Sequence, residues 1–586
     1  MRSQIKKAII KAVLAKFSNV ILPDFSVESP ENSQHGDYAS NIALILAKRL
    51  KRSPTEIAGI LKNELQSHLP AKIEVLPPGF INFFINRENL CENLKEIIKK
   101  KEKFGAFPKK KDSIIIEYSS PNIAKPMGVH HLRTTIIGQS LVNIYKFMGW
   151  KVLAMSFPGD WGTQFGALIS AYKKWGDQKK LKQNPVKEML NLYVRFSRMA
   201  EGNEDFADEA RKEFKLLESG DKENRKIWEW FRKESFKDFD RVYKKLCVKI
   251  PLVFSESFFE PYLKEVVSEA VKKKVAENGE DKSIVVKFKD GTPTLLLQKS
   301  DGATLYATRD LAQMKYRAKK WNPTKIVMVV ANQQTLYFEQ VFRASEMLGY
   351  FKRNQLTHVK FGMVLDSSGK KFATREGKLI PLEEVLNESV KRALGVVASL
   401  NPRLPQKEHP APFTNHAQKS ARYSKKVREQ IAEIVGIGAI KFFDLSQNRL
   451  SDILFDWNKM LNLKGSSAPY VQYTYARIKS VIRKSKEKPS NKFKPDILKE
   501  EPETDLVRHL MHFAEIVEDS ALRYEPNRIA EYLLKLSEKT NYFYEKLPVL
   551  NSEKEIRSAR IALIAGVSEI LKSGMKLLGI EVPEQM

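Results

Sequence analysis

Residues 113–165 limit the possible folds more than any other stretch, because they have the pattern of strand, turn, helix and strand. Residues 114–116 are three consecutive isoleucines, a run typical of a buried parallel strand. Two prolines then exclude regular structure until a helix begins near His130, and an apolar strand follows at 152–157. A strand–helix–strand crossover of this kind predicts an α/β domain with a doubly wound parallel sheet.

Polar residues occupy the turns of this unit. In doubly wound sheets, ligands bind beyond the carboxyl ends of the strands. That edge is predicted to carry Glu117, Asn122, Lys125, Gly128 and His131. The free backbone amides at the start of the helix can hold an anion. The segment therefore predicts a site for a phosphate-bearing ligand.

The overall charge points to a polyanionic partner. The chain has 586 residues, which predicts roughly two to four domains. Its 100 Lys and Arg against 70 Asp and Glu give a net charge of +30, and nucleic acid or an anionic membrane fits such an excess. We expect no membrane insertion, because the sequence lacks an apolar run near the ~20 residues that span a bilayer.

The N-terminus and the cysteines bear on location. Residues 1–17 have apolar residues at helical spacing among lysines, which favours an amphipathic first helix over the alternative of a transit peptide. Cys91 and Cys247 lie far apart without metal-ligand spacing. This usage predicts a cytoplasmic protein without a zinc site, and we expect no resident metal.

The central segment resembles the nucleotide-binding signature of class I aminoacyl-tRNA synthetases, specifically of the arginyl-tRNA synthetase family. The resemblance rests on NIAKP at 122–126, GVHH at 128–131 and LRTTIIG at 132–138. Gly128 stands where the family has its first histidine and His130 where it has glycine, while His131 keeps the second histidine. The resemblance implies that ATP is bound by Lys125, Gly128, His130 and His131.

The resemblance extends over nearly the whole chain and implies a domain order. Residues 1–108, with HGDYASN at 35–41, resemble the α+β N-terminal add-on domain. A Rossmann-type catalytic domain is expected at 109–398, with a helical connective insertion at about 168–280. A Pro-rich linker at 399–421 and an all-α anticodon-binding domain at 422–586 complete the order.

The sequence YATRDLA at 306–312 is characteristic of the arginyl family. On a helix, Tyr306 and Asp310 share a face, and a carboxylate suits a guanidinium substrate. Without the resemblance, such a pair is more often structural. After a predicted strand at 325–331, Tyr337 departs from the histidine that is usual in the family. The resemblance implies that arginine is bound by Glu117, Asn122, Tyr306, Asp310 and Gln334.

Residues 359–378 are predicted to form a strand followed by a basic, glycine-bearing loop. In isolation, a basic surface hairpin is the default interpretation. The loop aligns with the Lys-Met-Ser-Lys-Ser loop of class I enzymes, with Lys371 at the first lysine and Thr374 at the second. Such a loop can close over the triphosphate. The resemblance implies catalytic roles for Lys370, Lys371, His131 and Lys125, with Lys125 supplying the missing charge.

The C-terminal third is predicted to be helical, and it resembles the family's anticodon-binding domain. Tyr470, Tyr473 and Arg477 place aromatic rings beside a cation, which suits unstacked bases and phosphates. About half of the aromatic residues in this stretch are equally suited to the core. We nevertheless expect these three to contact tRNA.

The resemblance implies an arginine–tRNA ligase that uses ATP with Mg²⁺ to form arginyl-adenylate and transfers the arginyl group to tRNA(Arg). It further implies that adenylate formation needs bound tRNA, and we expect a monomer. The altered GVHH leaves a non-catalytic tRNA-binding paralogue as the main alternative. A cysteinyl or glutamyl synthetase is disfavoured by the carboxylates and by the lack of cysteine ligands for zinc.

Overall fold

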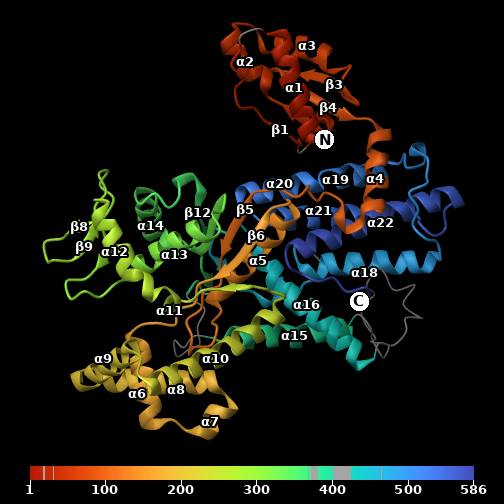
Figure 1. Cartoon of the computed structure of the whole chain (residues 1–586). Helices are drawn as coiled ribbons and strands as arrows, with labels where there is room; N and C mark the ends of the chain where they lie inside the picture. Colours follow the sequence, from red (N-terminus) through yellow and green to blue (C-terminus); the bar gives the residue numbers. More distant parts are fainter. Residues whose placement is uncertain (18–19, 31, 367, 371–379, 400–423, 464) are drawn as a thin grey trace.

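A computed structural model describes residues 1–17, 20–30, 32–366, 368–370, 380–399, 424–463 and 465–586. It confirms a multidomain α/β protein, in which a parallel sheet lies beside a helical C-terminal half, and an N-terminal α+β module sits on the C-terminal helices (Figure 1). The predicted Pro-rich linker falls outside the described residues from residue 400 onward. Within the described part of the chain, no helix is long and apolar enough to span a membrane.

The N-terminal module packs helices on an antiparallel sheet. Ser53 caps its third helix by accepting the N–H of Glu56 at 3.1 Å, and Pro54 takes the first position, where no N–H is needed. The sheet order is β1-β2-β4-β3. The elements are α1 (Arg2–Lys16), β1 (Val27–Glu28), β2 (Tyr38–Ser40), α2 (Ile42–Leu50), α3 (Pro54–Leu65), β3 (Ala71–Leu76) and β4 (Phe80–Ile85), and α4 (Arg87–Lys100) follows.

The central sheet has five parallel strands in the order β12-β11-β5-β6-β7. They are β5 (Ser113–Glu117), β6 (Lys151–Ser156), β7 (Leu252–Val253), β11 (Lys325–Ala331) and β12 (Leu356–Phe361). Helix α5 (His130–Phe147) connects β5 to β6, which confirms the predicted crossover. Gly138 of α5 lies against the ring of Tyr118, where a β-carbon would collide with the aromatic carbons. Helix and strand therefore approach closely just behind the predicted site.

A helical insertion follows β6. Its helices are α6 (Thr163–Trp175), α7 (Gln178–Gln183), α8 (Pro185–Ala200), α9 (Glu204–Ser219) and α10 (Lys222–Lys245). The chain rejoins the sheet earlier than residue 280, because Leu252 in β7 pairs with Met155 of β6. A smaller lobe then contains α11 (Glu256–Phe259), α12 (Leu263–Lys272), the antiparallel strands β8 (Glu277–Asn278), β9 (Ile284–Val286) and β10 (Leu295–Gln298), α13 (Tyr306–Lys320) and α14 (Thr335–Met347).

The C-terminal half is helical and shares its core with α5. Its elements are β13 (Val364–Leu365), which pairs with β14 (Ile453–Leu454), and α15 (Leu382–Ser399), α16 (Lys425–Leu445), α17 (Trp457–Met460), α18 (Ala468–Ser485), α19 (Glu501–Met511), α20 (Phe513–Arg523), α21 (Asn527–Lys546) and α22 (Lys554–Leu577). Arg133 of α5 forms a buried ion pair with Asp444 of α16 at 3.0 Å. The turn that contains the GVHH motif at 128–131, which we call the signature turn, leads into α5. This ion pair thus fixes α5 to the C-terminal half.

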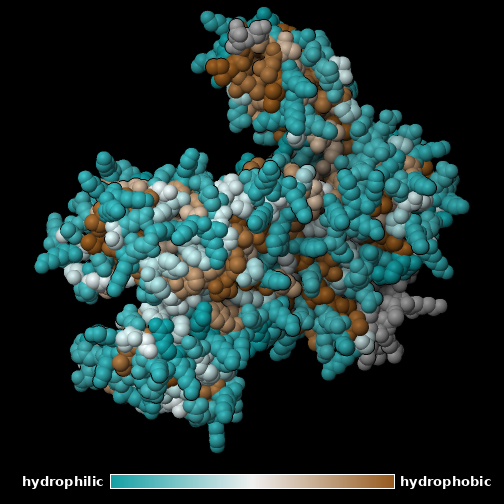
Figure 2. Space-filling view, in the orientation of Figure 1, coloured by the Kyte–Doolittle hydropathy of each residue, from teal (hydrophilic) through white to brown (hydrophobic). Residues whose placement is uncertain are grey.

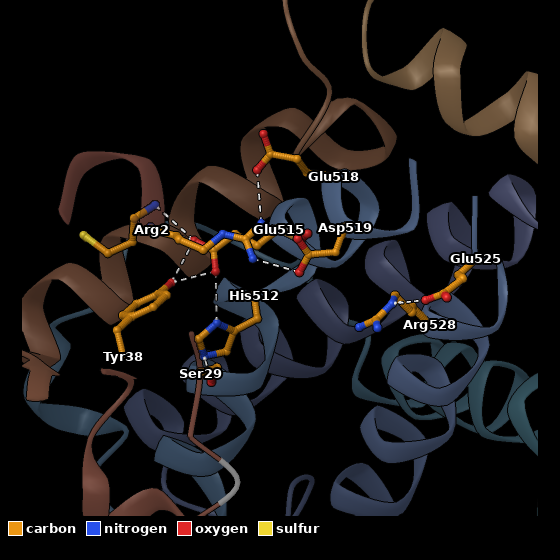
Figure 3. Close-up of polar contacts among 10 residues, drawn as sticks. Arg2, Ser29, Tyr38, His512, Glu515, Glu518, Asp519, Glu525 and Arg528 are labelled. Atoms are coloured by element: carbon orange, nitrogen blue, oxygen red, sulfur yellow. Dashed lines mark hydrogen bonds and ion pairs between the residues drawn. The ribbon is translucent and has the colours of Figure 1, made fainter. Parts of the chain in front are cut away.

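A polar cluster, which we call the terminal clamp, joins the N-terminal module to α20 (Figure 3). Its centre is Glu515, whose carboxylate accepts the Tyr38 hydroxyl at 2.9 and 3.1 Å and the backbone N–H of Arg2 at 2.7 Å. His512 lies 3.3 Å from the same carboxylate. The Arg2 guanidinium binds Asp519 at 2.8 Å. The first residues of the chain therefore dock on α20, a helix of the C-terminal half.

Candidate active site

The signature turn precedes α5 and is held mainly by backbone contacts. The N–H of Gly128 donates to Nδ1 of His131 at 3.1 Å, so the proton of the neutral imidazole lies on Nε2. Burial, followed by the neighbouring His130, lowers the pKa of His131 to about 3. The rings of His130 and His131 lie 3.8 Å apart, and the His130 side chain is exposed. At neutral pH, His131 is an uncharged hydrogen-bond donor at the helix start.

The same turn pairs with the residues that follow the basic loop. Val129 donates its N–H to Ile380 at 3.2 Å, and Leu382 donates to Met127 at 2.7 Å. On its other side, the loop begins at β13, which is paired with β14 of the C-terminal half. The described residues on the two sides of the loop are therefore held at the signature turn and at β14.

The predicted cations have different surroundings. Nζ of Lys125 lies 4.6 Å from the ring centre of Tyr193 in the helical insertion. The N–H of exposed Lys370 donates to Oδ1 of Asp366 at 3.0 Å, within a tight turn. Lys371 lies outside the described residues. Among the residues that the structure describes, no three His, Cys, Asp or Glu side chains are grouped as a resident metal would require.

Two buried carboxylates form the other half of the site. Glu117 ends β5, at the centre of the sheet, and Asp310 lies one turn into α13. They are 5 % and 7 % exposed. Oε2 of Glu117 is paired with the guanidinium of Arg317, and Oδ2 of Asp310 accepts the hydroxyl of Tyr337 from α14. We call Glu117 and Asp310 the carboxylate pair, and we call Arg317 and Tyr337 its anchors.

The electrostatics of the pair follow from burial. Burial, helped by the charge of Glu117, raises the pKa of Asp310 to about 7, although the hydroxyl of Tyr337 and the charge of Arg317 oppose the rise. Burial likewise raises the pKa of Glu117 against the opposing charge of Arg317. A cation that enters here restores the ionised form of Asp310. Such an environment favours a guanidinium or ammonium ligand.

The remaining predicted arginine ligands lie toward solvent. Asn122 is exposed and bridges to Gly159, where a β-carbon would collide with the Asn122 side chain. Tyr306, the first residue of α13, is 66 % exposed. Gln334 is also exposed, at the carboxyl end of β11. Thus Glu117 and Asp310 are buried, whereas Asn122, Tyr306 and Gln334 are exposed to solvent.

The predicted tRNA residues share one face of α18. Tyr470 accepts a hydrogen bond from Asn541 of α21 at 2.9 Å, and the Arg477 guanidinium lies 4.8 Å from the ring centre of Tyr544. Tyr473 is 37 % exposed. Nearby Tyr475 is buried, in line with the expectation that some aromatics of this stretch belong to the core. The face visible in Figure 2 is mainly hydrophilic.

Sequence reasoning missed the anchors of the carboxylate pair. Arg317 lies seven residues after Asp310, two turns along the same helical face, and this spacing was the available signal. Tyr337 stands out in the sequence only as a departure from the family. Its partner is 27 positions away in the chain, so local patterns could not reveal the contact.

Comparison with known families gives three matches that together span most of the chain. The family "tRNA synthetases class I (R), catalytic domain" matches residues 93–457. "DALR anticodon binding domain" matches 471–586, and "Arginyl tRNA synthetase N terminal domain" matches 1–85.

Relatives and solved structures agree with these matches along the full length. A protein of Fusobacterium nucleatum named arginine–tRNA ligase is 38% identical, with 97% of each chain covered. A Clostridioides difficile protein of the same name is 36% identical over 96% of this chain and 95% of its own. The arginyl-tRNA synthetase structure from Plasmodium falciparum is 26% identical with a TM-score of 0.81, and covers 100% of this chain and 99% of its own. That from Thermus thermophilus, at 23% identity and a TM-score of 0.83 with both chains fully covered, supports the fold.

Proposed function

The chain belongs to the arginyl-tRNA synthetase family, and on that premise we propose that it is an arginine–tRNA ligase, which activates L-arginine with ATP and transfers it to tRNA(Arg). The observation that carries the proposal is the buried carboxylate pair, whose Glu117 ends the strand that leads into α5, a helix whose free N-terminal amides can hold an anion. A guanidinium substrate and a triphosphate would meet between these two features.

The arginine side chain would bind to the carboxylate oxygens that the anchors leave free. These are Oε1 of Glu117 and Oδ1 of Asp310. A planar guanidinium can bind two carboxylates at once and gains strength because the site is shielded from water. The exposed side chains of Asn122 and Gln334 would hold the α-amino and carboxylate end of the substrate, and Tyr306 would close over it.

In the first step, a carboxylate oxygen of arginine attacks the α-phosphorus of ATP, and pyrophosphate leaves. In the second, a terminal ribose hydroxyl of tRNA attacks the activated carbonyl, and AMP leaves. No protein nucleophile is required, so catalysis rests on positioning and on charge stabilisation. Lys125, Lys370 and Lys371 would neutralise the phosphates of MgATP, and Nε2–H of His131 would donate to a phosphate oxygen.

The altered signature fits this scheme. A histidine replaces glycine at position 130, but its side chain is exposed at the first residue of α5. The hydrogen bond that shapes the turn runs from the backbone N–H of Gly128 to His131. A compensated exchange is therefore favoured over loss of activation. In such an exchange, His130 or a loop lysine would bind the phosphate group that the family's first histidine binds.

The net charge of +30 would attract the tRNA, whose anticodon end would lie near Tyr470, Tyr473 and Arg477. The domain boundaries proposed from the sequence, 1–108, 109–398 and 422–586, would assign these contacts to the last unit. The protein would act as a monomer in the cytoplasm.

The test is to charge total bacterial tRNA with each labelled amino acid in turn, in the presence of ATP and Mg²⁺. Arginine alone is expected on the tRNA. Tight tRNA binding without any charging would instead favour the non-catalytic paralogue. Charging with a different amino acid would overturn the assignment of the carboxylate pair.

A further inference from the structure

Each carboxylate of the pair has one oxygen bound to the protein. Oδ2 of Asp310 accepts the hydroxyl of Tyr337, and Oε2 of Glu117 is bound to Arg317. Asp310 and Arg317 come from α13, Glu117 from β5 and Tyr337 from α14. Three elements therefore fix the directions in which the two carboxylates present their remaining oxygens.

The hydroxyl of Tyr337 is the neutral anchor in a charged setting. The charged groups that face Asp310 are Glu117, Glu256 and the guanidinium groups of Arg309 and Arg317. A phenol adds a hydrogen bond without adding a positive charge that would compete with a cationic substrate. It can therefore orient Asp310 while the pair stays net attractive for a guanidinium.

We propose that Tyr337 is a positioning residue for substrate arginine: its hydroxyl holds Oδ2 of Asp310, so that Oδ1 faces the guanidinium. The proposal rests on the proposed function, since it takes Asp310 as an arginine ligand. Tyr337 acts through Asp310 and does not contact the reacting atoms.

The hydrogen bond also sets when Asp310 is ionised. It opposes the rise that burial causes in the pKa of this carboxyl. Without the hydroxyl, Asp310 would stay protonated to a higher pH and would swing between rotamers. Both effects weaken arginine binding and leave ATP binding unchanged.

The decisive variant is Tyr337→Phe, which removes the hydroxyl and keeps the ring. A matched control is Tyr350→Phe, because the Tyr350 hydroxyl donates to a carboxylate oxygen of Glu269 at 3.0 Å in the same lobe, outside the pair. Tyr337→His tests rescue, since histidine offers another hydrogen-bond donor. All are measured as full-length enzyme in tRNA charging across pH 6 to 9.

In Tyr337→Phe, we expect the KM for arginine to rise roughly tenfold or more, because a hydrogen bond to a charged group is lost. The kcat and the KM for ATP should stay nearly unchanged. The acid limb of kcat/KM for arginine should move to higher pH. Tyr350→Phe should match the parent, and Tyr337→His should recover part of the loss.

An arginine KM within twofold of the parent, or an unmoved acid limb, would overturn the proposal. So would equal increases in the KM for arginine and for ATP, because they would indicate a general structural defect. Failure of the proposed function is distinguishable, since the parent enzyme would then charge no tRNA with arginine.

Discussion

The carboxylate pair and the terminal clamp use the same chemistry to opposite effect. In both, a tyrosine hydroxyl donates to a carboxylate that is at least half-buried, and an arginine lies close by. Burial raises the pKa of Asp310 to about 7. Burial also acts to raise that of Glu515, yet His512, the N–H of Arg2 and the terminal ammonium bring it down to about 2.

The difference lies in how many donors each carboxylate has. Tyr38 reaches both oxygens of Glu515, and further donors reach them as well. Asp310 accepts one hydroxyl, from Tyr337. A saturated carboxylate stabilises the fold, whereas one with a spare oxygen and a raised pKa is suited to bind a cation.

The largest effect is expected from Asp310→Asn. The change removes a desolvated negative charge from the proposed guanidinium site and keeps the size of the side chain. We expect kcat/KM for arginine to fall roughly a thousandfold, or about 4 kcal/mol. Steady-state charging kinetics measure this loss, and a fall of less than tenfold would mean that the pair does not bind the substrate.

Next in size is Glu515→Gln, which breaks the clamp. The amide cannot accept all the donors that Glu515 now holds, so docking of the N-terminal module should weaken by about 3 kcal/mol. Hydrogen exchange of α1 and α20 measures the opening free energy, with charging of arginine as the functional readout. The control is Glu64→Gln, which removes an ion pair with Lys16 within the module. Equal hydrogen-exchange protection of α1 and α20 in Glu515→Gln and in Glu64→Gln would show that the clamp adds no stability.

The carboxylate pair and the terminal clamp should lose their function at different pH values. A raised carboxyl pKa means that the ionised form is lost as pH falls through about 7, so kcat/KM for arginine should drop about tenfold at pH 6. Glu515 has a lowered pKa, so its contribution is fully present above 4.5 and is lost only as pH falls toward 2. Charging and hydrogen exchange in the same buffers test this. An acid limb below pH 5 would contradict it.

The smallest effect is expected at the signature turn, because backbone groups rather than carboxylates hold this turn in place. The exchange Gly128→His/His130→Gly should change the activation rate less than tenfold, because the backbone N–H that binds His131 remains. Arginine-dependent pyrophosphate exchange, with tRNA present, measures the rate. A large gain would show that the natural arrangement is costly.

Local patterns predicted the elements around the site, and long-range contacts escaped them. Three isoleucines and two prolines were enough to predict β5 and α5, and the strand at 325–331 was predicted with its observed bounds. Periodicity relates residues up to two turns apart. The Glu117–Arg317 pair spans 200 positions and the clamp spans 513, so neither could be derived from spacing. The raised pKa of Asp310 depends on burial and could not be predicted either.

The terminal clamp also sets the timing of assembly. The N-terminal module leaves the ribosome before its docking helix α20, because Glu515 of that helix lies 513 residues behind Arg2. At about 5 to 20 residues per second, the module waits on the order of 25 to 100 s for its partner. During that interval, Arg2 and Tyr38 have no carboxylate to bind. The N-terminal module can therefore dock only after α20 has been synthesised.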